Sequence, residues 1–265
     1  MNKRFFVILI VALLFVCNSA LAWSGHTHIV IGHIAEQHLT PEAKEKCHHY
    51  LRHTLAYHAK WQDEVAFSKA YAESRYWHGV RYDAKNRYLY REGKNAITHI
   101  RRIYDEMKEG GYKKLTDSTI IVNLKFLIHM VGDMHCPSHN YYDDDPNPAF
   151  KRFSIFHKGK KVHWHKFWDR SAVDYFRRGW HCPDYVKNLD TYSEKEIAKM
   201  CKGGVEQWAK QNGKEMREPY SLLVRHIEFK DMPEENVERM RALVDKQIMR
   251  GGYRLAYLIN DIFKY

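Results

Sequence analysis

The sequence has little of several features that would mark other classes of protein. Beyond its first 22 residues it contains no second long apolar run, no internal repeat, no low-complexity linker and no glycine-rich phosphate loop. These absences leave no further candidate for a membrane span and give no support to a repeat architecture or a P-loop nucleotide site. The remaining chain has the length of one large domain or two small ones. With 45% hydrophobic residues overall, it can form a core.

The N-terminus has the pattern of a secretory signal peptide. "NKR" precedes the apolar stretch "FFVILIVALLFV", and the small residues "SALA" follow. We expect cleavage after Ala22, so that residues 1–22 are removed and Trp23 becomes the new N-terminus. Cys17 follows a valine, which argues against lipoprotein processing, and the run is short for the alternative of a retained anchor. The mature protein is therefore expected in the periplasm or the medium, without a stable membrane anchor.

The mature chain is basic. Loss of Lys3 and Arg4 with the leader lowers the formal net charge from +11 to +9. Such a charge attracts polyanions such as nucleic acid, or an anionic membrane surface, and it also fits a role in solubility alone.

Cysteine is scarce, and four cysteines remain after cleavage. In an exported protein four cysteines can form two disulfides in three connectivities. We expect Cys182 to pair with Cys201, because the two are close in sequence. The four are Cys47, Cys136, Cys182 and Cys201.

Hydrophobic periodicity predicts helices along almost the whole mature chain, and hence a single all-α domain over residues 23–265. The stretch 117–135 is apolar enough to be a central buried helix. The segment 141–162 lacks the helical period and predicts an irregular loop with a short hairpin.

Helix starts are marked by residue types that cap or open a first turn. The last of the expected helices continues toward the C-terminus with an interruption at Gly251 and Gly252, because glycine disfavours a helix interior. The expected starts are Thr40 with Pro41, Ser193 with Glu196, and Pro233.

Two charged side chains interrupt the central apolar helix. His129 and Asp133 are four residues apart and share one helix face. Burying Asp133 without a partner would cost several kcal/mol, so a base or a metal must compensate it. Taken alone, such a pair more often forms a structural hydrogen bond than a metal site. "GDMHCPSH" then adds His135 and His139 within one turn.

A second pair repeats this spacing. In "VHWHKFWDR", His165 and Asp169 are again four apart, at an expected helix start. Imidazole nitrogen with carboxylate oxygen suits zinc, whereas calcium and magnesium favour oxygen ligands alone. Asp63 in "AKWQDEVAF" and His78 in "RYWHGVRY" are further candidates. Each of these two, taken singly, fits a surface or satisfied core residue better than a ligand.

Together the motifs resemble a known family. They are "WSGHTH", "WQDE", "YWHGV", "LKFLIHMVGDMHCPSH", "HKFWD" and "GGYRLAYLIND", in this order. The chain is similar, over essentially its whole mature length, to the zinc-dependent single-strand-specific nucleases of type I, which share the fold of zinc phospholipase C. The resemblance implies a mainly helical domain that holds three zinc ions.

The resemblance also implies which residues bind zinc. One ion would be held by the N-terminal amine and carbonyl of Trp23 together with His28, and Asp133 would bridge it to a close neighbour. The neighbour's other ligands would be Asp63, His78 and His129. A third, more separate ion would be held by His139, His165 and Asp169.

The implied reaction is hydrolysis of phosphodiesters in RNA and single-stranded DNA to 5′-mononucleotides, with 3′-nucleotidase activity as a possible addition. A hydroxide between the two close ions would be the nucleophile. Asp63 would be the catalytic residue that orients it or accepts its proton. The third ion would stabilise the leaving oxygen. Substrates would be single-stranded nucleic acid or nucleotides, and we expect a monomer.

Three positions depart from the family pattern, and all concern the substrate. A lysine or arginine is usual where this chain has Ala66, an aromatic residue is usual at Gly79, and "GGN" is usual where it has Ala149, Phe150 and Lys151. Substitutes are available nearby, although the sequence does not place them. The cationic ones are Lys60, Lys69 and Arg81, and the aromatic ones are Trp61, Tyr76, Trp77 and Tyr82.

Other interpretations of these residues are weaker. Cys136 between two histidines suggests a nucleophile, but a catalytic thiol is liable to oxidation outside the cytosol. His135 and His163 have the wrong spacing for the family and are expected in supporting or surface positions. "DDDPN" lacks the spaced ligands of a calcium loop.

Two other functions remain open on the sequence. One is a zinc phospholipase C or another phosphodiesterase on the same scaffold. The other is a non-catalytic protein that retains zinc for structure, although a structural zinc site normally has four protein ligands and needs no shared carboxylate.

Overall fold

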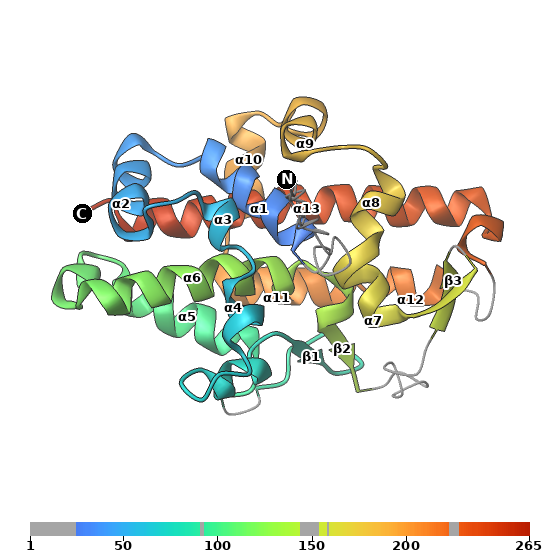
Figure 1. Ribbon diagram of the computed structural model, residues 1–265, viewed down its shortest axis with the longest axis horizontal. Coiled ribbons are helices and arrows are strands. Elements are labelled where there is room, and N and C mark those ends of the chain that lie inside the picture. The colour runs from blue at the N-terminus through green and yellow to red at the C-terminus, as the bar shows by residue number, and fades with distance from the viewer. Residues whose placement is uncertain (1–24, 91–92, 144–153, 158, 223–227) are drawn as a thin grey trace, which may run out of the picture.

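The computed structural model describes residues 25–90, 93–143, 154–157, 159–222 and 228–265. It is mainly helical, as the periodicity predicts. The predicted leader (1–22), Trp23 and the segment containing Ala149, Phe150 and Lys151 lie outside the described residues. The helices, shown in Figure 1, are α1 (His26–Gln37), α2 (Pro41–Leu51), α3 (Leu55–His58), α4 (Trp61–Val65), α5 (Ala96–Met107), α6 (Asp117–Met134), α7 (Trp164–Lys166), α8 (Ala172–Phe176), α9 (Cys182–Leu189), α10 (Glu194–Cys201), α11 (Gly204–Glu215), α12 (Glu218–Leu222) and α13 (Glu234–Ile262).

Caps fix several of the helix starts. The Thr40 side chain accepts a hydrogen bond from the backbone N–H of Ala43 at the start of α2, and Pro41 occupies its first turn. Ser193 and Glu196 form the predicted capping box of α10. Pro233 directly precedes α13. The helix starts expected from the sequence are confirmed.

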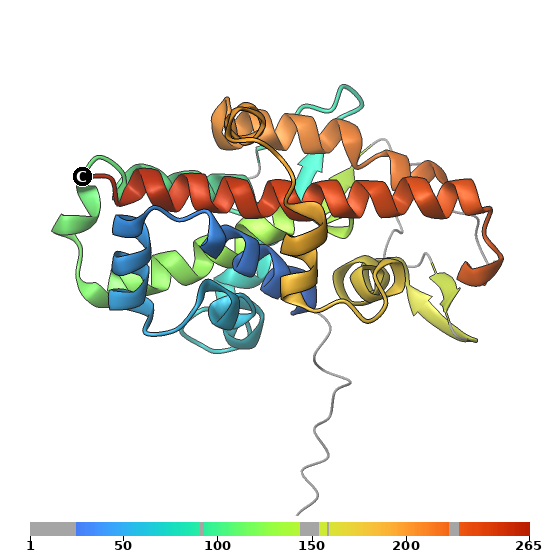
Figure 2. The same cartoon turned by 90° about the horizontal axis from the view of Figure 1, so that it is seen from above.

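Three helices, α1, α6 and α13, meet in the core. The 29-residue helix α13 runs along the molecule, and α1 packs against its middle (Figures 1 and 2). It continues through Gly251 and Gly252, so the predicted interruption is wrong. A Cβ at Gly252 would lie 2.4 Å from Cγ2 of Ile34 in α1. These glycines therefore allow close packing between helices rather than ending one.

The strands are few and short. β3 (Ser154–His157) and β4 (Lys160–His163) form an antiparallel hairpin inside the segment predicted to be a loop with a hairpin. β1 (Val80–Tyr82) pairs in parallel with β2 (Asn140–Tyr142), which the sequence did not predict. Three-residue strands carry too little alternation to be recognised, and this pair joins segments about sixty residues apart. The β1–β2 pair lies directly after two candidate ligands, His78 and His139.

The cysteines that the structure describes are all free. The predicted pairing of Cys182 with Cys201 is not formed. Cys201 is buried in the core at the end of α10, whereas Cys182 is only half-buried at the first residue of α9. Closeness in sequence did not indicate the directions of these side chains.

In the described parts of the chain, no helix combines the length and apolar character needed to cross a membrane.

Candidate metal centre

A buried carboxylate at the end of α6 is surrounded by histidines. Asp133 is 1% exposed. Its Oδ1 lies 3.2 Å from Nε2 of His28 and 3.3 Å from Nε2 of His139. Its Oδ2 lies 2.7 Å from Nδ1 of His78 and 3.3 Å from Nε2 of His129. Asp133 and these four histidines are called the Asp133 cluster below, and the structure brings together residues from α1, α6, the 3-10 helix Pro137–His139 and the loop that holds His78.

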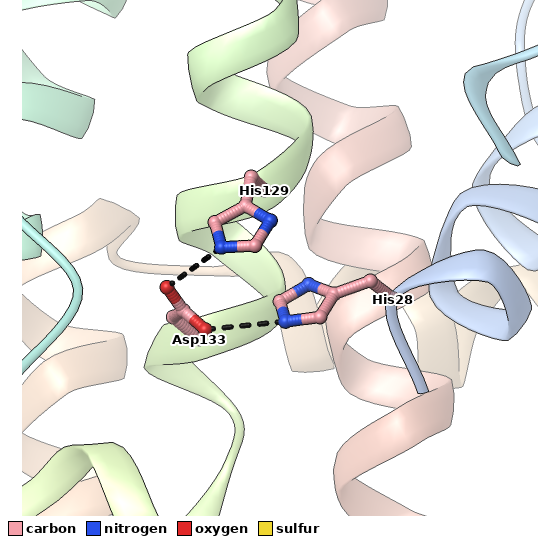
Figure 3. A group of neighbouring side chains, drawn as sticks. All are labelled: His28, His129 and Asp133. Carbon is pink, nitrogen blue, oxygen red and sulfur yellow. Dashed lines mark ion pairs between the residues drawn. The ribbon is translucent and has the colours of Figure 1, made fainter. Parts of the chain in front are cut away.

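The helices hold two of these rings face to face. His28, in the first turn of α1, stacks on His129 with 4.1 Å between ring centroids, and both point at Asp133 (Figure 3). A Cβ at Gly132 would lie 2.3 Å from Nδ1 of His28, so this glycine makes room for the ring beside α6. Nδ1 of His129 donates to the carbonyl oxygen of Ala59 at 2.8 Å. That bond directs Nε2 at the carboxylates and leaves it available as a ligand.

Asp63 lies at the accessible edge of the cluster. Its Oδ1 is 3.4 Å from Nε2 of His129 and 3.8 Å from Nδ1 of His78, and its side chain is 37% exposed. Gln62, which is fully buried, donates to the backbone oxygen of Ser74 and lies 3.3 Å from Nε2 of His78. Sequence reasoning missed Gln62, whose only signal is its place beside Asp63.

A third carboxylate, Asp169, extends the cluster. Nε2 of His139 is 3.3 Å from Oδ1 of Asp169 as well as from Asp133. The ring of His165 lies 4.7 Å from that of His139, centroid to centroid. Asp169 belongs to a π-helical segment, Phe167–Ser171, that follows α7. The sulfur of Cys136 also lies in this group, a position that sequence reasoning did not consider for a ligand.

Opposite charges stabilise one another in this site. Burial alone would raise the pKa of Asp133, but the charges of His139, His129 and His78 outweigh it and hold that pKa well below its usual range. Burial alone would lower the pKa of His139, but Asp133 and Asp169 raise it to about 9. Burial would likewise raise the pKa of Asp63, but its hydrogen bond with His129 brings it to about 2. The carboxylates and imidazoles of the site thus compensate one another's burial.

The donor set fits zinc. Oδ1 of Asp133, Nδ1 of His28 and Nδ1 of His139 are buried and have no hydrogen-bond partner among the described residues. Nitrogen atoms face carboxylate oxygens without hydrogen-bond geometry at Oδ1, which is the arrangement left when ligands converge on an ion rather than on one another. Three sets of side chains lie close enough to share a metal. They are His28, His129 and Asp133; Asp63, His78 and His129; and Cys136, His139 and Asp169.

His135, although it lies between the ligand candidates, faces away from this centre. Its Nδ1 donates to the carbonyl oxygen of Val131 at 2.7 Å, and its Nε2 accepts from Nη1 of Arg254 at 2.9 Å. His163, in β4, is exposed. The prediction that both residues have supporting or surface positions agrees with this arrangement, His135 being bonded to Arg254 and His163 lying at the surface.

The substitute aromatic residues named from the sequence differ in burial and packing. Tyr82 is fully buried, Trp61 packs edge-on against Phe126, and Trp77 stacks on a histidine ring. Tyr76, by contrast, is 42% exposed. Among the candidate cations, Arg81 is 44% exposed. At the position where the resemblance expects a cation, Ala66 is buried.

The chain was compared with protein-family models and with curated proteins. The model described as S1/P1 Nuclease matches residues 23–264. A search of curated proteins finds no match.

Proposed function

The chain belongs to the S1/P1 nuclease family, the zinc-dependent single-strand nucleases, and we propose that it hydrolyses RNA and single-stranded DNA to 5′-mononucleotides with three zinc ions. Activity as a 3′-nucleotidase is part of the proposal. The observation that carries it is Asp133, a fully buried carboxylate that contacts four imidazoles and accepts no hydrogen bond at Oδ1 from the described residues.

The proposed ligands divide into three sets that contain three carboxylates. Asp133 would be shared, since each of its oxygens faces histidines from different segments. His139 would bind the third ion on the side of Asp169, apart from the two ions at Asp133, since its Nε2 lies between Asp133 and Asp169. The sets are Trp23, His28 and Asp133; Asp63, His78, His129 and Asp133; and His139, His165 and Asp169.

Zinc bound there would lower the pKa of water toward about 7 and stabilise negative charge on the phosphoryl oxygens. The side chains of the chain position the reaction. Asp63 is the catalytic carboxylate, because it is the most exposed carboxylate of the site and its low pKa keeps it ionised, able to orient a water molecule. His165 is held neutral, since burial and the charge of His139 lower its pKa to about 4, and the neutral ring is the form that binds metal.

Export is part of the proposal. Cleavage after Ala22 would free the amine of Trp23, and the family match beginning at residue 23 supports this boundary. A mature protein extended by one alanine before Trp23 should lose one zinc ion and most of its activity. Unchanged zinc content and activity in the extended protein would remove Trp23 from the ligand set.

The activity test uses zinc-loaded mature protein and a panel of substrates. Single-stranded DNA and RNA should release 5′-mononucleotides, a 3′-nucleotide should release phosphate, and duplex DNA should react slowly. Asp63→Asn should lower cleavage at least about a hundredfold, in the range of a lost acid–base group. Asp231→Asn is the matched control, because Asp231 is exposed and pairs only with Lys230 in the described structure.

The panel also tests the alternatives. Diacylglycerol released from phosphatidylcholine, with no nucleotide product, would establish the phospholipase instead. Zinc-loaded protein that acts on no member of the panel would leave only a binding role.

A further inference from the structure

The parallel β1–β2 pair brings an arginine and a tyrosine to one face beside the metal centre. Arg81 pairs with Tyr141 in the register of the two strands. Their neighbours Val80, Tyr82 and Asn140 are buried, so the alternation of strand side chains places Arg81 and Tyr141 on the opposite face, where Arg81 is exposed and Tyr141 is half-buried. The guanidinium carbon of Arg81 lies 5.8 Å from the centre of the Tyr141 ring.

The tyrosine ring occupies the space above Gly79. A Cβ at Gly79 would lie 2.3 Å from Cε2 of Tyr141, which is closer than any real contact. A side chain at position 79 and this ring orientation therefore exclude each other. Since Gly79 directly follows His78, the ring lies where a side chain next to that candidate ligand would extend.

Both strands begin close in sequence to candidate ligands of the metal centre. β1 begins two residues after His78, and β2 begins directly after His139. The strand pairing therefore holds Arg81 and Tyr141 a few residues from both candidate ligands.

The guanidinium is oriented but keeps donors available. Nη1 of Arg81 contacts Oδ1 of Asp143 at 2.9 Å, and the side chain is 44% exposed. A guanidinium has five N–H donors, so this ion pair leaves several of them for an anion. An aromatic face and an arginine together match an unpaired base and its phosphate.

We propose that Tyr141 and Arg81 form a binding platform for single-stranded nucleic acid, on which a base stacks against Tyr141 while Arg81 contacts a phosphate. This inference rests on the proposed function and assigns the substrate contacts to this chain's own residues. Tyr141 takes the place of the aromatic side chain missing at Gly79. The competing assignment is a purely packing role for the ring.

The test compares two single-stranded oligonucleotides, one intact and one with abasic residues around the cleavage point. Tyr141→Leu should lower kcat/KM about tenfold on the intact strand, a loss typical for one stacked base, and leave the abasic strand nearly unchanged. Tyr141→Phe should retain activity on both. Arg81→Gln should lower kcat/KM on both strands alike, because both carry phosphates.

Two controls separate stacking from folding. Tyr257→Leu removes a 45% exposed tyrosine from α13 and should change neither substrate. Zinc content and binding of an uncleavable phosphorothioate strand are measured for every variant, and only binding should weaken in Tyr141→Leu. The double variant Gly79→Phe with Tyr141→Gly should recover the preference for the intact strand. It places an aromatic ring at position 79 and removes the ring at position 141 that would clash with it.

An equal loss on both strands in Tyr141→Leu would show a packing role and overturn the inference. Base-specific loss in Tyr76→Leu but not in Tyr141→Leu would do the same, since Tyr76 is exposed and lies beneath two cations, Arg75 and Lys94. In both cases the wild-type protein still cleaves, and the proposed function stands. Wild-type protein that cleaves neither strand would overturn both.

Discussion

Two buried charges lie at the same end of α6 and differ in how they are compensated. Asp133 and Arg254 are each 1% exposed. Arg254 is surrounded by acceptors, since its Nε donates to the backbone oxygen of Met200 at 3.1 Å and its other nitrogens donate to His135 and Gln211. Asp133 has four imidazoles within 3.3 Å but no hydrogen bond at Oδ1 from the described residues.

The contrast separates a structural charge from a metal-binding one. A buried charge in which each nitrogen donates a hydrogen bond holds elements together, here α13 to α10, α11 and the end of α6. Asp133 is hydrogen-bonded to His78 at Oδ2, whereas its Oδ1 faces two imidazole nitrogens without hydrogen-bond geometry, an arrangement suited to a cation between them. Residue type alone does not make this distinction, because His135 and His139 are four residues apart and belong to different centres.

Asp133→Asn should have the largest effect. The amide has nearly the same shape but cannot supply the negative charge that two metal ions would share. Zinc should be lost from the centre, and cleavage of single-stranded DNA should fall by more than the roughly 10–100-fold typical for outer partners of metal ligands. Metal analysis and kcat/KM measure both. Full zinc content with normal cleavage in this variant would refute the assignment of Asp133 as a metal-binding charge.

Arg254→Met should act on stability instead. It leaves His135, Gln211 and Met200 without their buried donor, so the free energy of unfolding should fall by about 3 kcal/mol. Denaturant unfolding of the metal-free protein measures the change. The zinc stoichiometry should equal that of the wild-type protein. Loss of zinc by the folded variant would show that the metal centre depends on Arg254.

His135→Asn tests the same distinction between structural and metal-binding side chains, with a smaller expected change in stability. It removes one buried hydrogen bond with Arg254 and should cost about 1–2 kcal/mol of stability. Zinc should remain, whereas His139→Asn should lose the ion nearest Asp169. Equal zinc loss in the two variants would mean that position in the sequence, and not side-chain direction, determines which histidine contributes to zinc binding.

The smallest expected effect is a pH dependence of the metal-free protein. The pKa of His139 is about 9 in the folded chain and near 6.5 when unfolded, so its contribution is complete below pH 6.5 and is lost as the pH rises to 9. His165, with a pKa of about 4, has no opposing effect above pH 6.5. The melting temperature should therefore fall by a few degrees over this window.

Zinc should abolish this dependence, because the ion replaces the protons. A metal-free protein whose melting temperature rises between pH 6.5 and 9 would contradict the proposed charge balance.

Local sequence signals predicted much of this molecule. Helical periodicity gave the fold class, and the spacing of His129 and Asp133 placed both on one face of a buried helix. Family motifs supplied His28, Asp63 and Asp169, which the structure brings to within a few ångströms of the cluster.

Features that depend on contacts between distant segments were missed. Gly251 and Gly252 looked like helix breakers, because the approach of Ile34 in α1 is invisible in the local pattern. The position of Tyr141 over Gly79 depends on a parallel strand pair of three residues on each side. A periodicity cannot indicate such a pairing, since it records only what one segment buries.

Titration of zinc into metal-free mature protein tests whether zinc bound around Asp133 is required for cleavage, with bound zinc and cleavage of single-stranded DNA measured in the same samples. Cleavage should be absent without zinc and should rise with occupancy until three ions are bound, while Asp133→Asn stays inactive throughout. Full cleavage in a chelator, or zinc-saturated wild-type protein that cleaves no single strand, would contradict this requirement.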